Sequence, residues 1–223
     1  VKHNIPSVAL TDKSNMFGLV KFFNKCEAAG IKPISGSSIR VAFEEDDQYH
    51  ELLCLAKTNQ GHKNLMRIIS LAHNNYNFQT PIIDFASLTQ LKDDIVVISG
   101  GKDSHIFNLL KRNKTEDAEK RIDQFLKVFD DDFVLEVQRT NRLDENEYFA
   151  NLLPLSSKKG IPLIATNDVL FSKEEDFDIH ETKVCINTGK TLNDPNREKL
   201  FSKEQYFKSS AEMEDLFDGF DEL

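Results

Sequence analysis

Cysteine is scarce in this chain of 223 residues. The three cysteines, Cys26, Cys54 and Cys185, are odd in number, far apart and not in a CxxC arrangement. That pattern argues against a disulfide framework. Each cysteine lies among apolar residues, so we expect reduced thiols in the core of a cytoplasmic protein rather than nucleophiles or metal ligands.

Long apolar runs and glycine-rich loops are also missing. No apolar stretch approaches the ~20 residues of a membrane span, and residues 1–6 resemble no signal peptide. The absence of a GxGxxG or GxxxxGKS loop leaves a nucleotide-binding fold without support. The chain lacks an initiator Met and stops at Leu223 in mid-pattern, so we expect it to be a segment of a longer protein.

The composition is that of a globular domain with an acidic surface. Hydrophobic residues make up 39% and charged residues 29%, which allows a sizeable core. Aspartate and glutamate number 37 against 28 lysines and arginines, a net charge of −9. An acidic surface repels phosphate, so the chain is a poor candidate for binding nucleic acid unaided. The acidity either keeps the domain soluble or partly meets a basic partner.

Short apolar runs alternate with amphipathic segments. Strands are predicted at 8–10, 95–98, 133–137 and 161–165, with a half-buried strand at 39–43 beside another at 50–56. Apolar stripes predict helices around 19–26, 65–72, 118–129 and 148–155, and Ser209 with Glu212 has the spacing of a capping box that begins a last helix. The alternation is typical of βα units around a parallel sheet.

Small and polar residues gather where predicted strands end. Thr11 and Asp12 follow the first strand, 99–101 follow another, and 166–168 follow the last. A (β/α) barrel builds its site at this end of its strands, although other α/β folds also place ligand groups there.

Six phrases, read in order, resemble the N-terminal domain of the alpha subunits of bacterial DNA polymerase III, which belongs to the PHP (polymerase and histidinol phosphatase) family. The phrases are residues 10–18, 30–36, 55–65, 99–101, 165–169 and 188–197. The resemblance implies an α/β fold, a distorted (β/α)7 TIM-like barrel. It also implies a PHP domain over residues 1–200, with its start missing, and a helical segment over 201–223 that leads towards the polymerase body.

Active members of that family hold a metal cluster, typically of three ions, for phosphoesterase or 3′–5′ exonuclease chemistry. The family's first His-x-His motif would precede Val1. Of the visible ligand positions, the resemblance keeps two and loses four. The resulting vestigial site comprises Asp12, Lys13, Ser38, His50, Gly101, Asp168 and Leu170, with His50 and Asp168 as the retained ligands. The resemblance therefore implies that this chain has no bound metal and no catalytic residue.

The charges of this vestigial site need partners. We expect the Lys13 ammonium to replace the missing metal charge and to pair with Asp168 or Asp12. His50 is either an ordinary half-buried strand histidine or a remnant of the metal site.

The other histidines carry weaker expectations. His180 stands two residues after Asp178, as in an Asp-x-His ligand pair, but it lies in a predicted helical stretch, so we expect no ligation. His62, His73 and His105 are expected to be exposed loop or helix residues.

The resemblance implies a parent that is a DNA-directed DNA polymerase using magnesium, while nothing here resembles the polymerase's catalytic region. This domain would then be a structural scaffold and docking site for the proofreading exonuclease (epsilon) subunit, meeting DNA only through the holoenzyme and no membrane. Two alternatives stay open. One is an active metal-dependent phosphoesterase or 3′–5′ exonuclease with at least five converging ligands. The other is a free-standing binding module unrelated to replication.

Overall fold

The computed structural model describes residues 3, 5–46, 48–74 and 80–220. Its strands are β1 (Ser7–Leu10), β2 (Lys32–Ala42), β3 (Tyr49–Ala56), β4 (Ile83–Asp84), β5 (Ile95–Ile98), β6 (Phe133–Gln138) and β7 (Leu163–Thr166). Its α-helices are α1 (Leu19–Ala28), α2 (Asn59–Asn74), α3 (Phe85–Gln90), α4 (His105–Lys111), α5 (Thr115–Phe129), α6 (Glu145–Lys159), α7 (Phe177–Thr188) and α8 (Ser210–Leu216), with 3₁₀ turns at Asp130–Asp132 and Glu174–Asp176.

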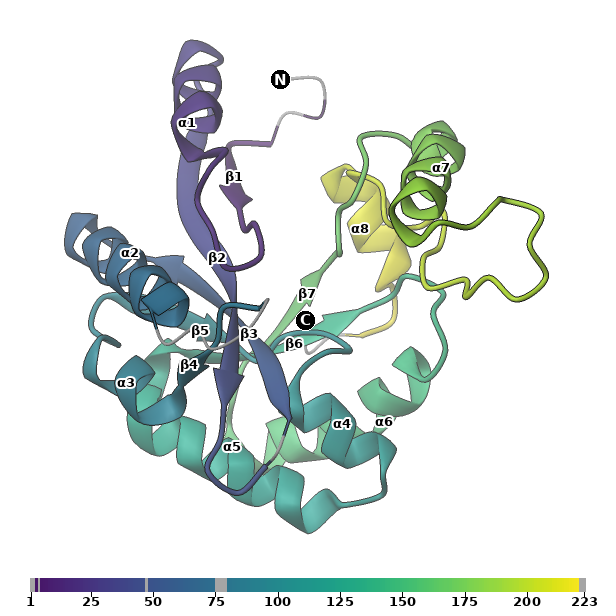
Figure 1. Ribbon diagram of the computed structural model, residues 1–223. Helices are drawn as coiled ribbons and strands as arrows, with labels where there is room; N and C mark the ends of the chain where they lie inside the picture. Colours follow the sequence, from purple (N-terminus) through teal and green to yellow (C-terminus); the bar gives the residue numbers. More distant parts are fainter. Residues whose placement is uncertain (1–2, 4, 47, 75–79, 221–223) are drawn as a thin grey trace.

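The seven strands form one mixed, curled sheet (Figure 1). The order is β1-β2-β3-β5-β6-β7, and the short β4 pairs with β2. Strand β3 is antiparallel to both β2 and β5, whereas the pairs β1–β2, β2–β4, β5–β6 and β6–β7 are parallel. All strands except β3 therefore point the same way, and their carboxyl ends share one edge with the start of β3.

The predicted elements are largely confirmed, and their periodicity explains where they lie. The stripe on α2 buries Leu65, Ile68 and Ala72, which face the sheet. The apolar run of β5 is buried at Ile95, Val97 and Ile98. The β-branched residues of such a run suit a strand with cover on both faces.

One hydrophobic core lies between the sheet and the helices α2 to α6, which follow its convex side in Figure 1. Phenylalanines dominate it: Phe43 from the end of β2 contacts Phe85 of α3 and Phe125 of α5. Such aromatic pairs add about 0.5–1.5 kcal/mol each to the burial of their area. This core fixes the end of β2 and the start of β3, where the site residues begin.

Residues 201–220 pack onto the rest of the domain. The predicted capping box of α8 is confirmed, since the Ser209 hydroxyl accepts a hydrogen bond from Glu212 N and the Glu212 carboxylate accepts one from Ser209 N. Phe217 joins the hydrophobic core, and Gln205 is fully buried. The division at residue 200 stays a prediction.

Two features differ from the expected barrel. The sheet is not all parallel, because β2 and β3 form a hairpin that reverses β3. In the described part of the chain β1 and β7 pair on one side only, so the closed seven-stranded barrel is not confirmed. Within that same part, none of the helices has the length and apolarity needed to cross a membrane.

Candidate functional site at the carboxyl edge of the sheet

Lys13, directly after β1, lies in a cluster of carboxylates. Its Nζ is 2.9 Å from Glu51 Oε1 and 3.7 Å from Asp103 Oδ2. Burial alone would lower the pKa of Lys13, but the hydrogen bond and charge of Glu51, together with Asp103, outweigh it and raise that pKa. The expected partner was wrong: Lys13 pairs with Glu51 and Asp103, not with Asp168 or Asp12.

Glu51 is the strand residue that faces this cluster. Ser38 Oγ donates to Glu51 Oε2 at 3.0 Å, and the Ser38 backbone bridges to Lys13 across the β1–β2 pair. His50, its neighbour on β3, points to the opposite face because side chains alternate along a strand. The structure therefore brings Lys13 and Ser38 together but not His50. The sequence analysis chose His50 as the site residue of β3, one position before Glu51. The signal that could have identified Glu51 is an acidic side chain directly after His50, which alternation along the strand places on the other face.

Gly101 lies against a glutamine that occupies the space of a side chain. A Cβ atom at Gly101 would stand 2.4 Å from Gln138 Oε1. The Gln138 amide is held there, since Nε2 donates to Thr166 Oγ1 at 3.3 Å and Oε1 accepts from Arg142 Nη2 at 2.9 Å. A cysteine at position 101, as the family pattern has it, would collide with this amide.

Asp168, after β7, is paired with Arg142, whose side chain is 10% exposed. Arg142 Nη1 donates to Asp168 Oδ2 at 3.1 Å, and Gln205 Nε2 donates to the same oxygen at 2.8 Å. Arg142 Nε also reaches Thr140 Oγ1 at 2.6 Å and Glu145 Oε1 at 3.1 Å. Sequence analysis did not foresee Arg142, which ties the loop after β6 to the loop after β7 by bonds that only a guanidinium can make together.

Glu136 is buried on β6 beside this network. Its Oε1 accepts a hydrogen bond from Thr166 Oγ1 and one from Gln138 Nε2 at 3.2 Å. Burial raises the pKa of Glu136, and these hydrogen bonds oppose the rise only in part. The folded state therefore holds a proton on Glu136 more tightly than the unfolded chain does.

Replacing Glu136 by glutamine should change how stability depends on pH. A raised pKa gives a contribution that is complete below the unfolded value of 4.5 and is lost as pH rises through the folded pKa. The Glu136→Gln variant has no such loss. Between pH 5 and pH 8, its free energy of unfolding, measured by urea denaturation, should therefore rise relative to that of the wild type. A difference independent of pH would contradict the buried, proton-binding carboxyl. Glu204→Gln, at a partly exposed site, is the control.

A second group lies at the same edge but on the helix-covered face. Asp46, His50 and His105 are the one set of three or more His, Cys, Asp or Glu residues, among those the structure describes, whose ligand atoms could share a metal. His105 was expected to be exposed, and this was wrong: it is 6% exposed at the start of α4. Burial and the charges of His50 and Arg121 lower the pKa of His105 to about 4, so its ring is neutral at neutral pH.

The remaining predicted residues lie apart from both groups. Leu170 is exposed in the loop after β7, and Asp12 contributes its backbone carbonyl, which accepts from Ser37 Oγ at 2.7 Å. His73 is an exposed residue of α2, as expected. His62, also on α2, was expected to be exposed but is partly buried, with Nδ1 2.9 Å from Ser35 Oγ. His180 on α7 belongs to no metal-binding group of the described residues. All three cysteines are buried free thiols, as predicted.

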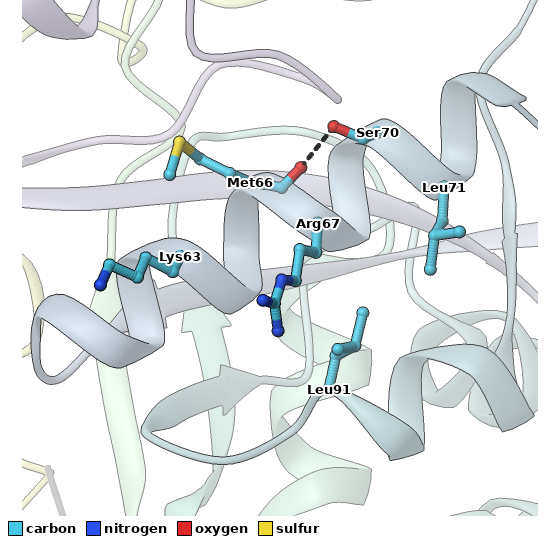
Figure 2. Close-up of a pocket in the computed structure, with 6 residues that line it drawn as sticks. All are labelled: Lys63, Met66, Arg67, Ser70, Leu71 and Leu91. Carbon is cyan, nitrogen blue, oxygen red and sulfur yellow. Dashed lines mark hydrogen bonds between the residues drawn. The ribbon is translucent and has the colours of Figure 1, made fainter.

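A surface hollow lies away from this edge. Figure 2 shows it between α2 and Leu91, with a volume of about 460 Å³. Lys63, Met66, Arg67, Ser70, Leu71 and Leu91 line it. Ser70 donates to the Met66 carbonyl within the helix, and the wall carries no carboxylate, histidine or cysteine. The hollow offers no catalytic group.

The comparisons with known proteins agree with this architecture. The family model described as the PHP domain matches residues 1–140. The chain belongs to the PHP domain family. Similarity to individual relatives extends beyond residue 140.

DNA polymerase III alpha subunits are the relatives that align along nearly the whole chain. The subunit of Vibrio cholerae is 40% identical over 96% of this chain, and those of Pasteurella multocida and Escherichia coli are 38% identical over 97% and 96%. The chain spans 18–19% of the length of these relatives. A solved structure from Bifidobacterium adolescentis, titled a putative metal-dependent phosphoesterase, aligns at 12% identity over 75% of this chain and 78% of its own. Its TM-score of 0.44 is too low to carry an argument.

Proposed function

We propose that this PHP domain is part of a replicative DNA polymerase III alpha subunit and serves it as a structural scaffold without a catalytic metal cluster. The parent would be a magnesium-dependent DNA-directed DNA polymerase of the cytoplasm. The domain would pack against the polymerase body and carry the proofreading exonuclease (epsilon) subunit. The curled sheet would form most of the family's distorted seven-stranded barrel.

The observation that carries the proposal is the ammonium of Lys13 among the carboxylates of Glu51 and Asp103. A cation cluster at this edge would meet a fixed positive charge, which repels metal ions and uses up the negative charge that would attract them. The Arg142 guanidinium on Asp168 has the same effect at the other end of the edge. With Arg40, whose Nε lies 3.7 Å from Glu51 Oε1, three protein cations face the three carboxylates that an active site would offer to metals.

The test uses the full-length parent subunit, purified without chelator. We expect no 3′–5′ degradation of a single-stranded primer with manganese or zinc, and no more than one equivalent of zinc, iron and manganese combined by elemental mass spectrometry. Two to three equivalents together with exonuclease activity would overturn the scaffold and support the phosphoesterase alternative. When epsilon is added, we expect 3′–5′ degradation of the primer. If the two subunits do not co-elute, the docking role is contradicted.

A further inference from the structure

Asp46, His50 and His105 converge on one point at the end of the β2–β3 hairpin. His50 Nε2 is 2.7 Å and His105 Nε2 3.4 Å from the same oxygen, Asp46 Oδ2. The two imidazole rings are stacked, with centroids 4.2 Å apart and planes 2° from parallel. Two rings from distant parts of the chain thus present the same nitrogen to a single carboxylate.

The separations of the three ligand atoms suit a shared zinc ion. The three ligand atoms lie within 4.8 Å of one another. A tetrahedral zinc ion with bonds of about 2.0–2.1 Å separates its ligand atoms by about 3.3 Å. Each ring contacts Asp46 through its Nε2 atom. Each Nδ1 is buried and has no hydrogen-bond partner among the described residues. Imidazole binds zinc through a lone pair in the plane of its ring, so the two rings must rotate out of their parallel stack to direct both Nε2 atoms at one ion.

The three side chains are held by their surroundings. His50 is fixed in β3 at 3% exposure, and His105 opens α4, whose N-cap Ser104 accepts from Phe107 N. The second carboxylate oxygen of Asp46 accepts from Gln48 N at 3.0 Å, which orients the first towards the rings. Such an outer hydrogen bond is a regular part of metal sites. Asp46 is partly exposed, which leaves room for a water molecule as a fourth ligand.

Arg121 is a neighbouring positive charge that interacts electrostatically with Asp46, but its direct contacts are to other groups. It pairs with Glu45 and stacks over the Phe43 ring at 4.0 Å. Asp46 is therefore shared by the two histidines. The site is distinct from the vestigial one, because neither Asp46 nor His105 occupies a family ligand position and His50 faces away from Lys13.

We propose that Asp46, His50 and His105 bind a single zinc ion that joins the β2–β3 hairpin to the start of α4. The ion has three protein ligands and a water molecule. It stabilises the hairpin rather than acting on phosphodiesters, since it lies on the helix-covered face.

The test is zinc binding to the full-length parent in competition with a chromophoric chelator, comparing wild type with variants of this site. We expect the wild type to bind one equivalent with a Kd below about 1 μM, and His105→Phe to bind it at least about 100-fold more weakly. Asp46→Asn, a partly exposed site that spares the core, should weaken it at least about 10-fold. His62→Gln, on α2, is the matched control and should bind zinc as the wild type does.

Cobalt reports the same coordination independently. Cobalt added to the wild type should give the visible d–d bands of a low-coordinate site, and these bands should be lost in Asp46→Asn. Zinc affinity in His105→Phe and Asp46→Asn equal to the wild type would overturn the proposal, as would a wild-type Kd weaker than about 100 μM. The outcome is separate from the scaffold proposal, because that proposal allows up to one equivalent of metal and is overturned only by two to three equivalents with exonuclease activity or by a failure to bind epsilon.

Discussion

Replacing Arg142 by methionine should lower the free energy of unfolding by about 3 kcal/mol, because the change removes a buried, hydrogen-bonded charge. The guanidinium contacts Gln138, Thr140, Glu145 and Asp168 at once. Without it, the carboxylate of Glu145, which is 7% exposed, loses its ion pair and keeps the hydrogen bonds from Thr140 and from the backbone N–H of residue 142. Urea denaturation of the chain at neutral pH measures the difference.

Arg142→Lys separates the charge from its geometry. A lysine keeps the positive charge but cannot donate to Thr140, Gln138 and Asp168 together, so we expect a loss intermediate between wild type and Arg142→Met. Lys203→Met, at an exposed position, controls for the loss of any positive charge. A loss below about 1 kcal/mol for Arg142→Met would place Arg142 among surface ion pairs and contradict its role in joining the two loops.

Gly101→Ala should cost about 2 kcal/mol, through Gln138 rather than through the backbone. The new Cβ would displace the Gln138 amide and break its hydrogen bonds to Glu136, Thr166 and Arg142. In a cycle with Gln138→Ala, the double variant should lose little more than either single variant, which gives a coupling of about 1–2 kcal/mol. Denaturation of the four proteins supplies the cycle.

Additive losses in that cycle would show that Gly101 acts independently of Gln138 and would contradict the collision. The expected coupling has a functional meaning. Restoring the cysteine of the family pattern at position 101 would cost stability before any metal arrived. A single reversion therefore does not rebuild a ligand, because the Gln138 amide, held by Arg142, occupies the space.

Sequence periodicity predicted most elements, since apolar stripes and β-branched runs directly record which face is buried. It did not predict the short α3, α4 and β4, which carry too few residues for a period to be recognised. The reversal of β3 was also hidden, because a strand's side-chain pattern is the same in either direction. Strand order and closure depend on contacts between distant segments.

The site was predicted in part for the same reason. The resemblance placed Lys13, Ser38, Gly101 and Asp168 at the carboxyl edge, where the structure has them. Their partners were missed, because pairing depends on loops that meet only in the folded chain. The burial of His105 was hidden because Ser104 and Gly101 surround it with small polar residues typical of a loop.

The alternation of His50 and Glu51 along β3 makes these neighbours independent in evolution. Glu51 is constrained by Lys13 and Ser38, whereas His50 is constrained by Asp46 and His105. A lineage can therefore lose ligands on one face and keep or gain them on the other. A shift of β3 by one residue against its neighbours β2 and β5 would exchange the faces of the two side chains and disrupt both groups at once.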